Sequence, residues 1–306
     1  VSHTRQMALL QKETIGYEGG LNSHSWRLTS DEGGHLKGTD LAPFPLGFFN
    51  ACIHGDVVGR IFKLAKIENL LIDEIKCEVK NSYFLTGSFV KGDGKGHAEP
   101  TEINLVIKTA EENSKIEQLI EKCSQTSPIL TALRTPLKNT FSLTANGRRK
   151  KLSNLNESKK IDAEDPYQFY SKSPSPNKNE NYSKRMILKT GRVSDGEIEP
   201  VDGYNVSASS GSVPGNENFN KIIRTIVGNS ITKNNDETVE VDTVLGLPGM
   251  SHFVISMDIN GLKAPSPVNV MGAAISFCFL TQTHRYIKHQ KFAIEGLRMS
   301  QYATFE

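Results

Sequence analysis

The chain repeats part of itself, and this repeat constrains its fold more than any other feature of the sequence. A shift of 222 positions aligns residues 42–75 with residues 264–297 without a gap. The turn Ala42–Leu46 falls on Ala264–Val268, and the apolar positions that follow continue to match. Each segment predicts a Pro-x-Pro turn, a long apolar helix, a short turn and a strand. Two copies of one folding unit are therefore expected.

The half of the chain before residue 147 predicts an α+β fold. Phe48 to about Ile67 is expected to be a buried helix, because its apolar residues recur at three-to-four spacing. Gly55 and Gly59 share one stripe of this helix and predict the close approach of another helix. Three strands are then expected, at Ile75–Val79, Tyr83–Val90 and Ile103–Ile107. A helix through Ile116–Cys123 follows, and the Ser127-Pro128 pair is typical of the next helix start.

Residues 147–184 differ in composition from both halves. The basic run Arg148–Lys151 is followed by a stretch rich in serine, asparagine and lysine. Too few apolar groups stand there to offset the entropy of ordering, which favours a flexible linker. The expected division is a first copy at 1–146, a linker, and a second copy at 185–306. The basic run could contact an acidic partner, but a solvated linker surface is the favoured interpretation.

The composition excludes several classes of protein. The 306 residues contain 36 lysines and arginines against 34 aspartates and glutamates, so overall charge favours neither a nucleic acid nor a membrane partner. No apolar stretch approaches the roughly 18 residues that a membrane span needs. The four cysteines show no CxxC and no metal-finger spacing, which fits a reducing compartment. A cytoplasmic protein without a cofactor is the expectation.

The second copy resembles the OsmC/Ohr family of thiol-dependent, hydroperoxide-detoxifying proteins. The turn Ser266-Pro267 leads into an apolar helix, and Cys278 follows about three turns later, where the family places its peroxide-attacking thiol. The first half resembles the N-terminal half of fused, two-copy members in Pro45–Phe49 and Leu133–Leu137.

The resemblance implies both an architecture and a reaction. Each copy would be a sheet with a long buried central helix, and the two copies would form an intramolecular pseudo-dimer or a homo-oligomer. The second copy would be incomplete, because the counterpart of Ser127 would lie beyond Glu306. In the reaction, Cys278 would attack an organic hydroperoxide, and a thiol reductant would regenerate it.

The chain departs from the family pattern in its first copy. The repeat places Asp56 opposite Cys278, and Ser127 occupies the position of the later, resolving cysteine. The glutamate that follows the turn in many members is missing from both copies, where Leu46-Gly47 and Val268-Asn269 stand. The first copy is therefore expected to carry a degenerate site.

A peroxide-attacking cysteine must be a thiolate, so Cys278 needs a nearby cation. Arg285 lies seven residues later, two helical turns away on the same face, and is the candidate; the alternative for it is a surface arginine. The alternative for Cys278 is a small apolar core residue. Cys52 and Cys123 each precede a family thiol position by one helical turn; they are either a displaced redox pair or two buried structural cysteines. Cys77 is expected in the core.

Cys52, His54 and Asp56 together suggest a metal site at first sight. On a helix, however, Cys52 and Asp56 share a face while His54 points away, so the three cannot converge on one ion. No metal site is expected.

Two functions remain open. One is a redox protein that reduces organic hydroperoxides through Cys278. The other is a non-catalytic member of the same fold that serves as a binding or assembly module. Asp56 and Ser127 favour the second function for the first copy, whereas Cys278 favours the first function for the second copy.

Overall fold

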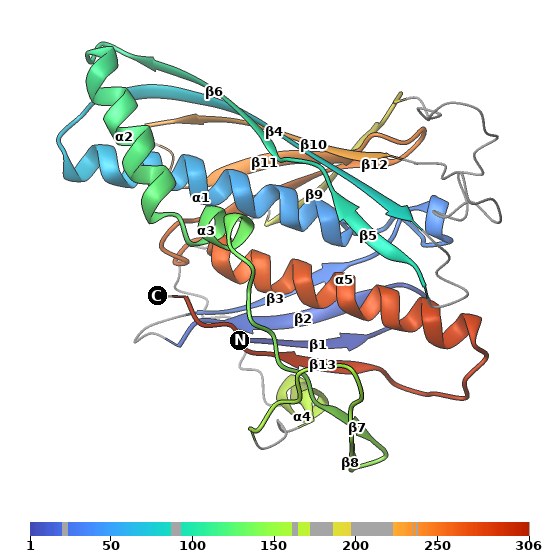
Figure 1. The fold of residues 1–306 in the computed structure, drawn as a ribbon. Helices are drawn as coiled ribbons and strands as arrows, with labels where there is room; N and C mark the ends of the chain where they lie inside the picture. The colour runs from blue at the N-terminus through green and yellow to red at the C-terminus, as the bar shows by residue number, and fades with distance from the viewer. Residues whose placement is uncertain are drawn as a thin grey trace.

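Two long helices, α1 (Pro45–Ile67) and α5 (Pro267–His289), lie side by side between two antiparallel β-sheets (Figure 1). The computed structural model describes residues 1–19, 24–86, 93–160, 165–171, 186–196, 223–234, 236 and 238–305. The protein has the expected mixed α+β architecture. None of the helices in these ranges is long and apolar enough to cross a membrane.

Both long helices form where the repeat predicts them. Each begins with a proline in its first turn, which suits the fixed backbone angle and missing N–H of that residue. Ser266 caps α5, because its hydroxyl accepts a hydrogen bond from the Asn269 backbone N–H at 3.1 Å. The helices meet at Phe48 and Phe277, whose ring centroids lie 5.5 Å apart. Fifteen of the 23 residues of α1 and 11 of the 23 residues of α5 are buried, as expected for elements packed between two sheets.

The smaller sheet contains four strands in the order β13-β1-β2-β3. Its strands are β1 (Ser2–Gln6), β2 (Lys12–Tyr17), β3 (Ser25–Ser30) and β13 (Arg298–Gln301). A short 3₁₀ turn, η1 (Gly34–Leu36), follows β3 and leads toward α1. The sheet therefore combines the first three strands of the chain with the last one.

The larger sheet has the order β5-β4-β10-β11-β12-β9, with β6 also paired to β4. Its strands are β4 (Ile72–Thr86), β5 (Lys95–Ala98), β6 (Glu102–Thr109), β9 (Ile187–Val193), β10 (Arg224–Lys233), β11 (Val239–Leu245) and β12 (Ser251–Met257). The two strands expected at 75–79 and 83–90 are one continuous strand up to Thr86, and residues 87–90 lie outside the described residues. Strand β4 pairs with β10 from Glu74 to Tyr83, so this sheet also joins distant parts of the chain.

The helices α2 (Asn113–Thr126) and α3 (Pro128–Arg134) pack against α1. Both confirm the sequence prediction. Ser127 caps α3 as expected, with its hydroxyl accepting from the Leu130 N–H at 2.9 Å.

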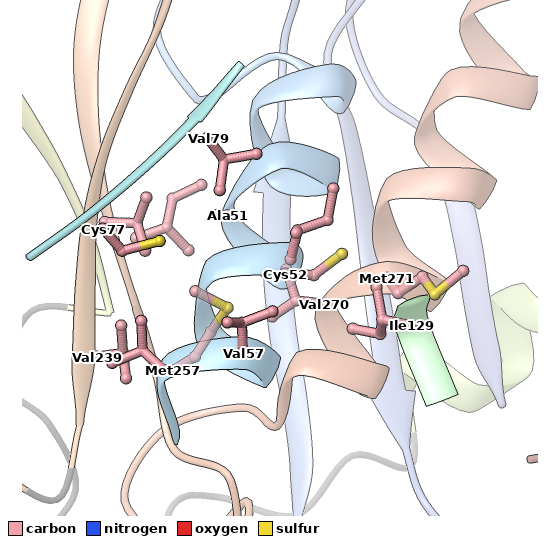
Figure 2. Close-up of a cluster of buried hydrophobic side chains, with 14 of the residues drawn as sticks. Ala51, Cys52, Val57, Cys77, Val79, Ile129, Val239, Met257, Val270 and Met271 are labelled. Atoms are coloured by element: carbon pink, nitrogen blue, oxygen red, sulfur yellow. The ribbon is translucent and has the colours of Figure 1, made fainter. Parts of the chain in front are cut away.

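The main core lies around α1, and Figure 2 shows Cys52, Val57, Cys77 and Met257 within it. The prediction that another helix approaches Gly55 and Gly59 is wrong. A Cβ atom on Gly55 would lie 2.8 Å from Met257 Sδ, and a Cβ on Gly59 would lie 3.0 Å from Ile259 Cβ. The two glycines therefore make room for β12 and for Ile259, two residues beyond its end, because sheet and helix pack closely there.

Where it is described, the predicted linker contains regular structure. Strand β8 (Arg148–Lys150) pairs with β7 (Leu143–Ala145), and α4 (Pro166–Ser171) packs on the small sheet. The Tyr170 hydroxyl lies 2.8 Å from the backbone carbonyl oxygens of both His3 and Glu13. Residues 161–164 and 172–184 of the predicted linker lie outside the described residues.

Candidate functional site

Cys278 differs from the other three cysteines in its surroundings. It lies at the middle of α5 and is partly buried, whereas Cys52, Cys77 and Cys123 are buried in the core. All four thiols are free. Cys77 is 3% exposed, which confirms its expected place in the core.

Cys278 lines a pocket of about 400 Å³ between α1 and α5. The lining is almost entirely apolar; besides Cys278, it consists of Pro45, Leu46, Phe49, Tyr83, Ala274, Ile275, Phe279 and Gln282. The Phe279 ring also faces the Phe141 ring at 6.5 Å between centroids. A pocket of this size and character suits an organic molecule with little polarity.

A buried polar group lies beside Cys278 on the side of the small sheet. Lys12 is only 2% exposed, and its Nζ donates to Thr281 Oγ1 at 2.5 Å and to Glu32 Oε1 at 3.4 Å. The Thr281 hydroxyl donates to the same Glu32 oxygen at 2.7 Å. Strand β2, the segment after β3 and helix α5 each contribute one of these side chains.

The pKa of Cys278 reflects three competing influences. Burial raises the pKa of the thiol to about 11, and the Glu32 carboxylate adds to the rise. The Lys12 ammonium opposes both and lowers the pKa of the thiol. Lys12 is therefore the cation whose charge acts on Cys278, although burial also lowers the pKa of Lys12 itself.

Arg285, the cation expected to assist Cys278, lies in a second cluster near the pocket. Its guanidinium donates to Gln282 Oε1 at 3.0 Å. Burial lowers the pKa of Arg285, while Glu32 raises it. The pKa of His35 is lowered to about 4, chiefly by burial and further by the charges of Arg224 and Arg285. Three cationic side chains, Lys12, Arg224 and Arg285, thus share the charge of Glu32.

The two positions that the resemblance assigns to thiols in the first copy are in direct contact. The Ser127 hydroxyl donates a hydrogen bond to Asp56 Oδ2, and both residues are fully buried. Arg60 donates to the other carboxylate oxygen of Asp56 at 2.6 Å. The sequence comparison therefore located both residues of this site, and the structure gives them an ionic network in place of thiols.

Cys52 and Cys123 each bond to the backbone of α1. The Cys52 thiol donates to the Phe49 carbonyl at 3.0 Å, and the Cys123 thiol donates to the Val57 carbonyl at 3.6 Å. Burial is the largest cause that raises their pKa values: that of Cys123 to about 12, and that of Cys52 well above its usual range. Neither thiol has the character of a nucleophile at neutral pH.

Cys52, His54 and Asp56 face different neighbours. His54 Nδ1 is hydrogen-bonded to Ser230 Oγ at 3.2 Å, whereas Asp56 is bonded to Arg60 and Ser127. Within the described ranges, no group of three or more histidine, cysteine, aspartate or glutamate side chains could hold a metal ion.

Sequence reasoning missed Lys12 and Glu32. Both stand in polar stretches that resemble exposed strand ends, and nothing in their local pattern predicts burial. They are buried because α5, more than 230 residues away in the chain, covers this side of the small sheet. Only the tertiary arrangement reveals their position.

Comparisons with known proteins find a likeness at the level of structure. No family model matches the sequence, and no curated protein matches it. Among solved structures, the chain is similar to an OsmC-like hydroperoxide resistance protein from Jannaschia sp. CCS1. The match covers 48% of this chain and 93% of that chain, with 16% identity and a TM-score of 0.33.

Proposed function

We propose that the protein reduces organic hydroperoxides through Cys278. One observation carries the proposal: this thiol borders an apolar pocket of about 400 Å³, and the charge of the buried Lys12 lowers its pKa. The pocket supplies a place for the organic part of a peroxide. The cation favours the thiolate, which is the nucleophilic form.

The proposed reaction is a two-electron transfer. The Cys278 thiolate attacks the outer peroxide oxygen, so an S–O bond forms while the O–O bond breaks. The departing alkoxide takes up a proton and leaves as an alcohol, and Cys278 becomes a sulfenic acid. Two equivalents of a thiol reductant then return Cys278 to the thiol, and they leave as a disulfide with one molecule of water.

Lys12, Glu32 and Thr281 have a positioning role in this proposal. The hydrogen bonds from Lys12 and Thr281 to Glu32 fix the ammonium beside the pocket. Since the lysine is buried, its charge is poorly screened and acts strongly on the thiol. Glu32 keeps Lys12 charged at the cost of a less acidic Cys278.

We further propose that residues 1–146 and 185–306 are two OsmC-like copies that form an intramolecular pseudo-dimer. The strand order supports this arrangement. The strand after α5 (β13) is followed in its sheet by β1, β2 and β3, and the strand after α1 (β4) is followed by β10, β11 and β12. In each sheet, three consecutive strands that precede one central helix pair with the strand that follows the other.

Matching contacts support the same relationship. Ser276 on α5 accepts a hydrogen bond from Thr4 on β1 at 2.8 Å. His54, which stands at the same repeat position on α1, is bonded to Ser230 on β10. Each helix thus places a polar side chain against the first of three consecutive strands, β1 for α5 and β10 for α1.

The loops before the two central helices also correspond. Asp31 and Asp258 each follow the third strand, and each carboxylate accepts backbone N–H groups of its own loop. The Asp31 N–H donates to the Pro43 carbonyl and the Asp258 N–H to the Pro265 carbonyl. Pro43 and Pro265 are related by the repeat.

Trapping of the sulfenic acid tests the peroxidase proposal. The full chain would be treated briefly with cumene hydroperoxide at pH 9 in the presence of dimedone, and each cysteine would be followed by mass spectrometry. We expect the dimedone adduct on Cys278 and none on Cys52, Cys77 or Cys123. Cys278→Ser should abolish the adduct, whereas the control Cys123→Ser should retain it.

A non-catalytic binding module is the second candidate, and the high pKa of Cys278 favours it. In that case the pocket would hold an apolar ligand, and the cysteine would be part of its wall. An unmodified Cys278 in folded protein after hydroperoxide treatment would contradict the peroxidase and leave this function.

A further inference from the structure

The segment that follows α3 carries a concentrated positive charge. Residues 138–160 contain seven lysines and arginines and one glutamate, a net charge of +6 in a chain whose total is +2. The rest of the chain is therefore net negative, so the positive charge of this segment is not evident from the overall composition. Nearly all of its side chains are exposed.

Hydrogen bonds give this segment a defined shape. The turn Asn146-Gly147, with positive φ angles of 52° and 72°, joins β7 to β8 as a tight hairpin. The Phe141 N–H donates to the Asn156 carbonyl at 2.8 Å, and the Ser158 N–H donates to the Phe141 carbonyl at 2.7 Å. The stretch 156–158 is thereby held beside the strand that enters the hairpin.

The pairing of β7 with β8 sorts its side chains onto two faces. Leu143 lies opposite Lys150 and Ala145 opposite Arg148, and opposite residues of an antiparallel pair project to the same side. Leucine, alanine and two cations therefore share one face, which we call the hairpin face. Arg149 projects to the other side, where it donates to the carbonyls of Ser158 and Lys160.

The hairpin face has no protein partner among the described residues. Arg148 and Lys150 form no ion pair there, and Leu143 is 51% exposed. Leu137 and Leu155 are similarly exposed, at 57% and 54%. Exposed leucines are normal singly, but two of them within this cationic segment and a third directly before it mark an interaction surface.

We propose that the hairpin face docks the protein peripherally on an anionic phospholipid surface. The cations complement lipid phosphates and carboxylates, and long lysine and arginine side chains keep their charge at the headgroups while their stems lie on apolar chains. The leucines enter the boundary between headgroups and acyl chains. A nucleic acid would use the cations but not the leucines. It would also favour exposed aromatic rings for stacking, and Phe141, the aromatic residue of this segment, instead faces Phe279.

This inference does not depend on the proposed peroxidase activity. It differs from the expectation that overall charge sets for the chain, because charge acts on a surface only within about 10 Å at ordinary ionic strength. The basic hairpin is therefore the part of the charge distribution that a membrane would experience.

Vesicle co-sedimentation of the full chain tests the inference. Vesicles of phosphatidylcholine with about one third phosphatidylserine should bind the protein at low salt, and pure phosphatidylcholine vesicles should bind it much less. Each cation near an anionic surface contributes about fivefold in affinity, so Arg148→Glu with Lys150→Glu should lower binding by at least about 25-fold. The control pair Lys95→Glu with Lys108→Glu changes the same charge at exposed positions of the large sheet and should retain binding.

A third variant separates lipid from other anionic partners. Leu143→Ser should weaken vesicle binding while leaving its dependence on salt unchanged. All these positions are exposed, so thermal melting should confirm that every variant is folded. Equal binding of the Arg148→Glu/Lys150→Glu variant, no binding of the wild type to anionic vesicles, or binding to a DNA or RNA duplex but not to vesicles would each overturn the proposal.

Discussion

The Ser127 hydroxyl donates a hydrogen bond to the Asp56 carboxylate, although the two residues stand 71 positions apart in the chain. Asp56 also pairs with Arg60, and Ser127 caps α3 by accepting from the Leu130 N–H. The contact ties α1 to α3 through a buried charge. In residues 1–146, a structural network thus occupies the two positions at which the OsmC/Ohr resemblance places thiols.

Ser127→Ala should destabilise the protein substantially. The change removes a helix cap, worth about 1 kcal/mol, and a hydrogen bond to a buried charge, worth roughly 1.5–3 kcal/mol. We expect a loss of about 2–4 kcal/mol in the free energy of unfolding, measured by urea denaturation. Thr126→Ala, at the exposed neighbouring position, is the control and should change stability by less than about 0.5 kcal/mol.

The central helices and the Ser127 cap could be predicted because their signals are local. Apolar spacing, a proline in the first turn and a capping serine each act within a few residues. The sheets could not be predicted in the same way. Pairing of Glu74–Tyr83 with Arg224–Lys233 depends on contacts between segments about 150 residues apart. The local sequence of either strand does not indicate which strand it pairs with.

The exchange of strands between the two parts of the chain leads to a second prediction. If a protease site is inserted between α4 and β9 and the chain is cut there, the two pieces should remain together. The continuous β4–β10 pairing and the packing of α1 on α5 should hold them, since neither depends on the connection. Size-exclusion chromatography of the cut protein should give one peak at the original volume. Two separate folded pieces would contradict the proposed pseudo-dimer.

The site was only partly accessible to sequence reasoning. The family resemblance identified Cys278 and Ser127, and the repeat placed Asp56 opposite Cys278 because it compares equivalent positions on two helices. The cation that acts on the thiol comes from β2, and the repeat carries no information about what a different element brings to the pocket. This is why Arg285, on the same helix, was the candidate while Lys12 was overlooked.

His54 should make the protein sensitive to acid. Burial lowers its pKa to about 3 from the ordinary 6.5, so the unfolded state binds an extra proton between these values. Stability is therefore present above pH 6.5 and is lost as pH falls toward 3. His54→Gln should reduce the slope of stability against pH in this window by up to about 1.4 kcal/mol per pH unit. The matched change at exposed His289 should leave the slope as in the wild type.

The reactivity of Cys278 should follow its raised pKa. Because the thiolate fraction grows about tenfold per pH unit below the pKa, alkylation by iodoacetamide should accelerate steadily from pH 7 to about 10 and level off only above pH 11. Lys12→Met removes the charge that opposes burial and Glu32, so it should raise the pKa of Cys278 further and slow alkylation at neutral pH, where Lys12 is charged; the difference should shrink as the pH rises through the lowered pKa of Lys12. Lys66→Met, at an exposed position of α1, is the control and should leave the profile unchanged.

The two alternative outcomes of that experiment point to different errors. A plateau near pH 7 would mean that the thiol is far more acidic than its burial implies, and a cation other than Lys12 would have to lie closer to it. If the wild type shows the expected pH profile and Lys12→Met leaves that profile unchanged, only the positioning role of Lys12 would be contradicted. Burial is the largest cause of the raised pKa. The pH at which alkylation levels off should therefore stay well above that of a free cysteine in every folded variant that preserves the burial of the Cys278 thiol.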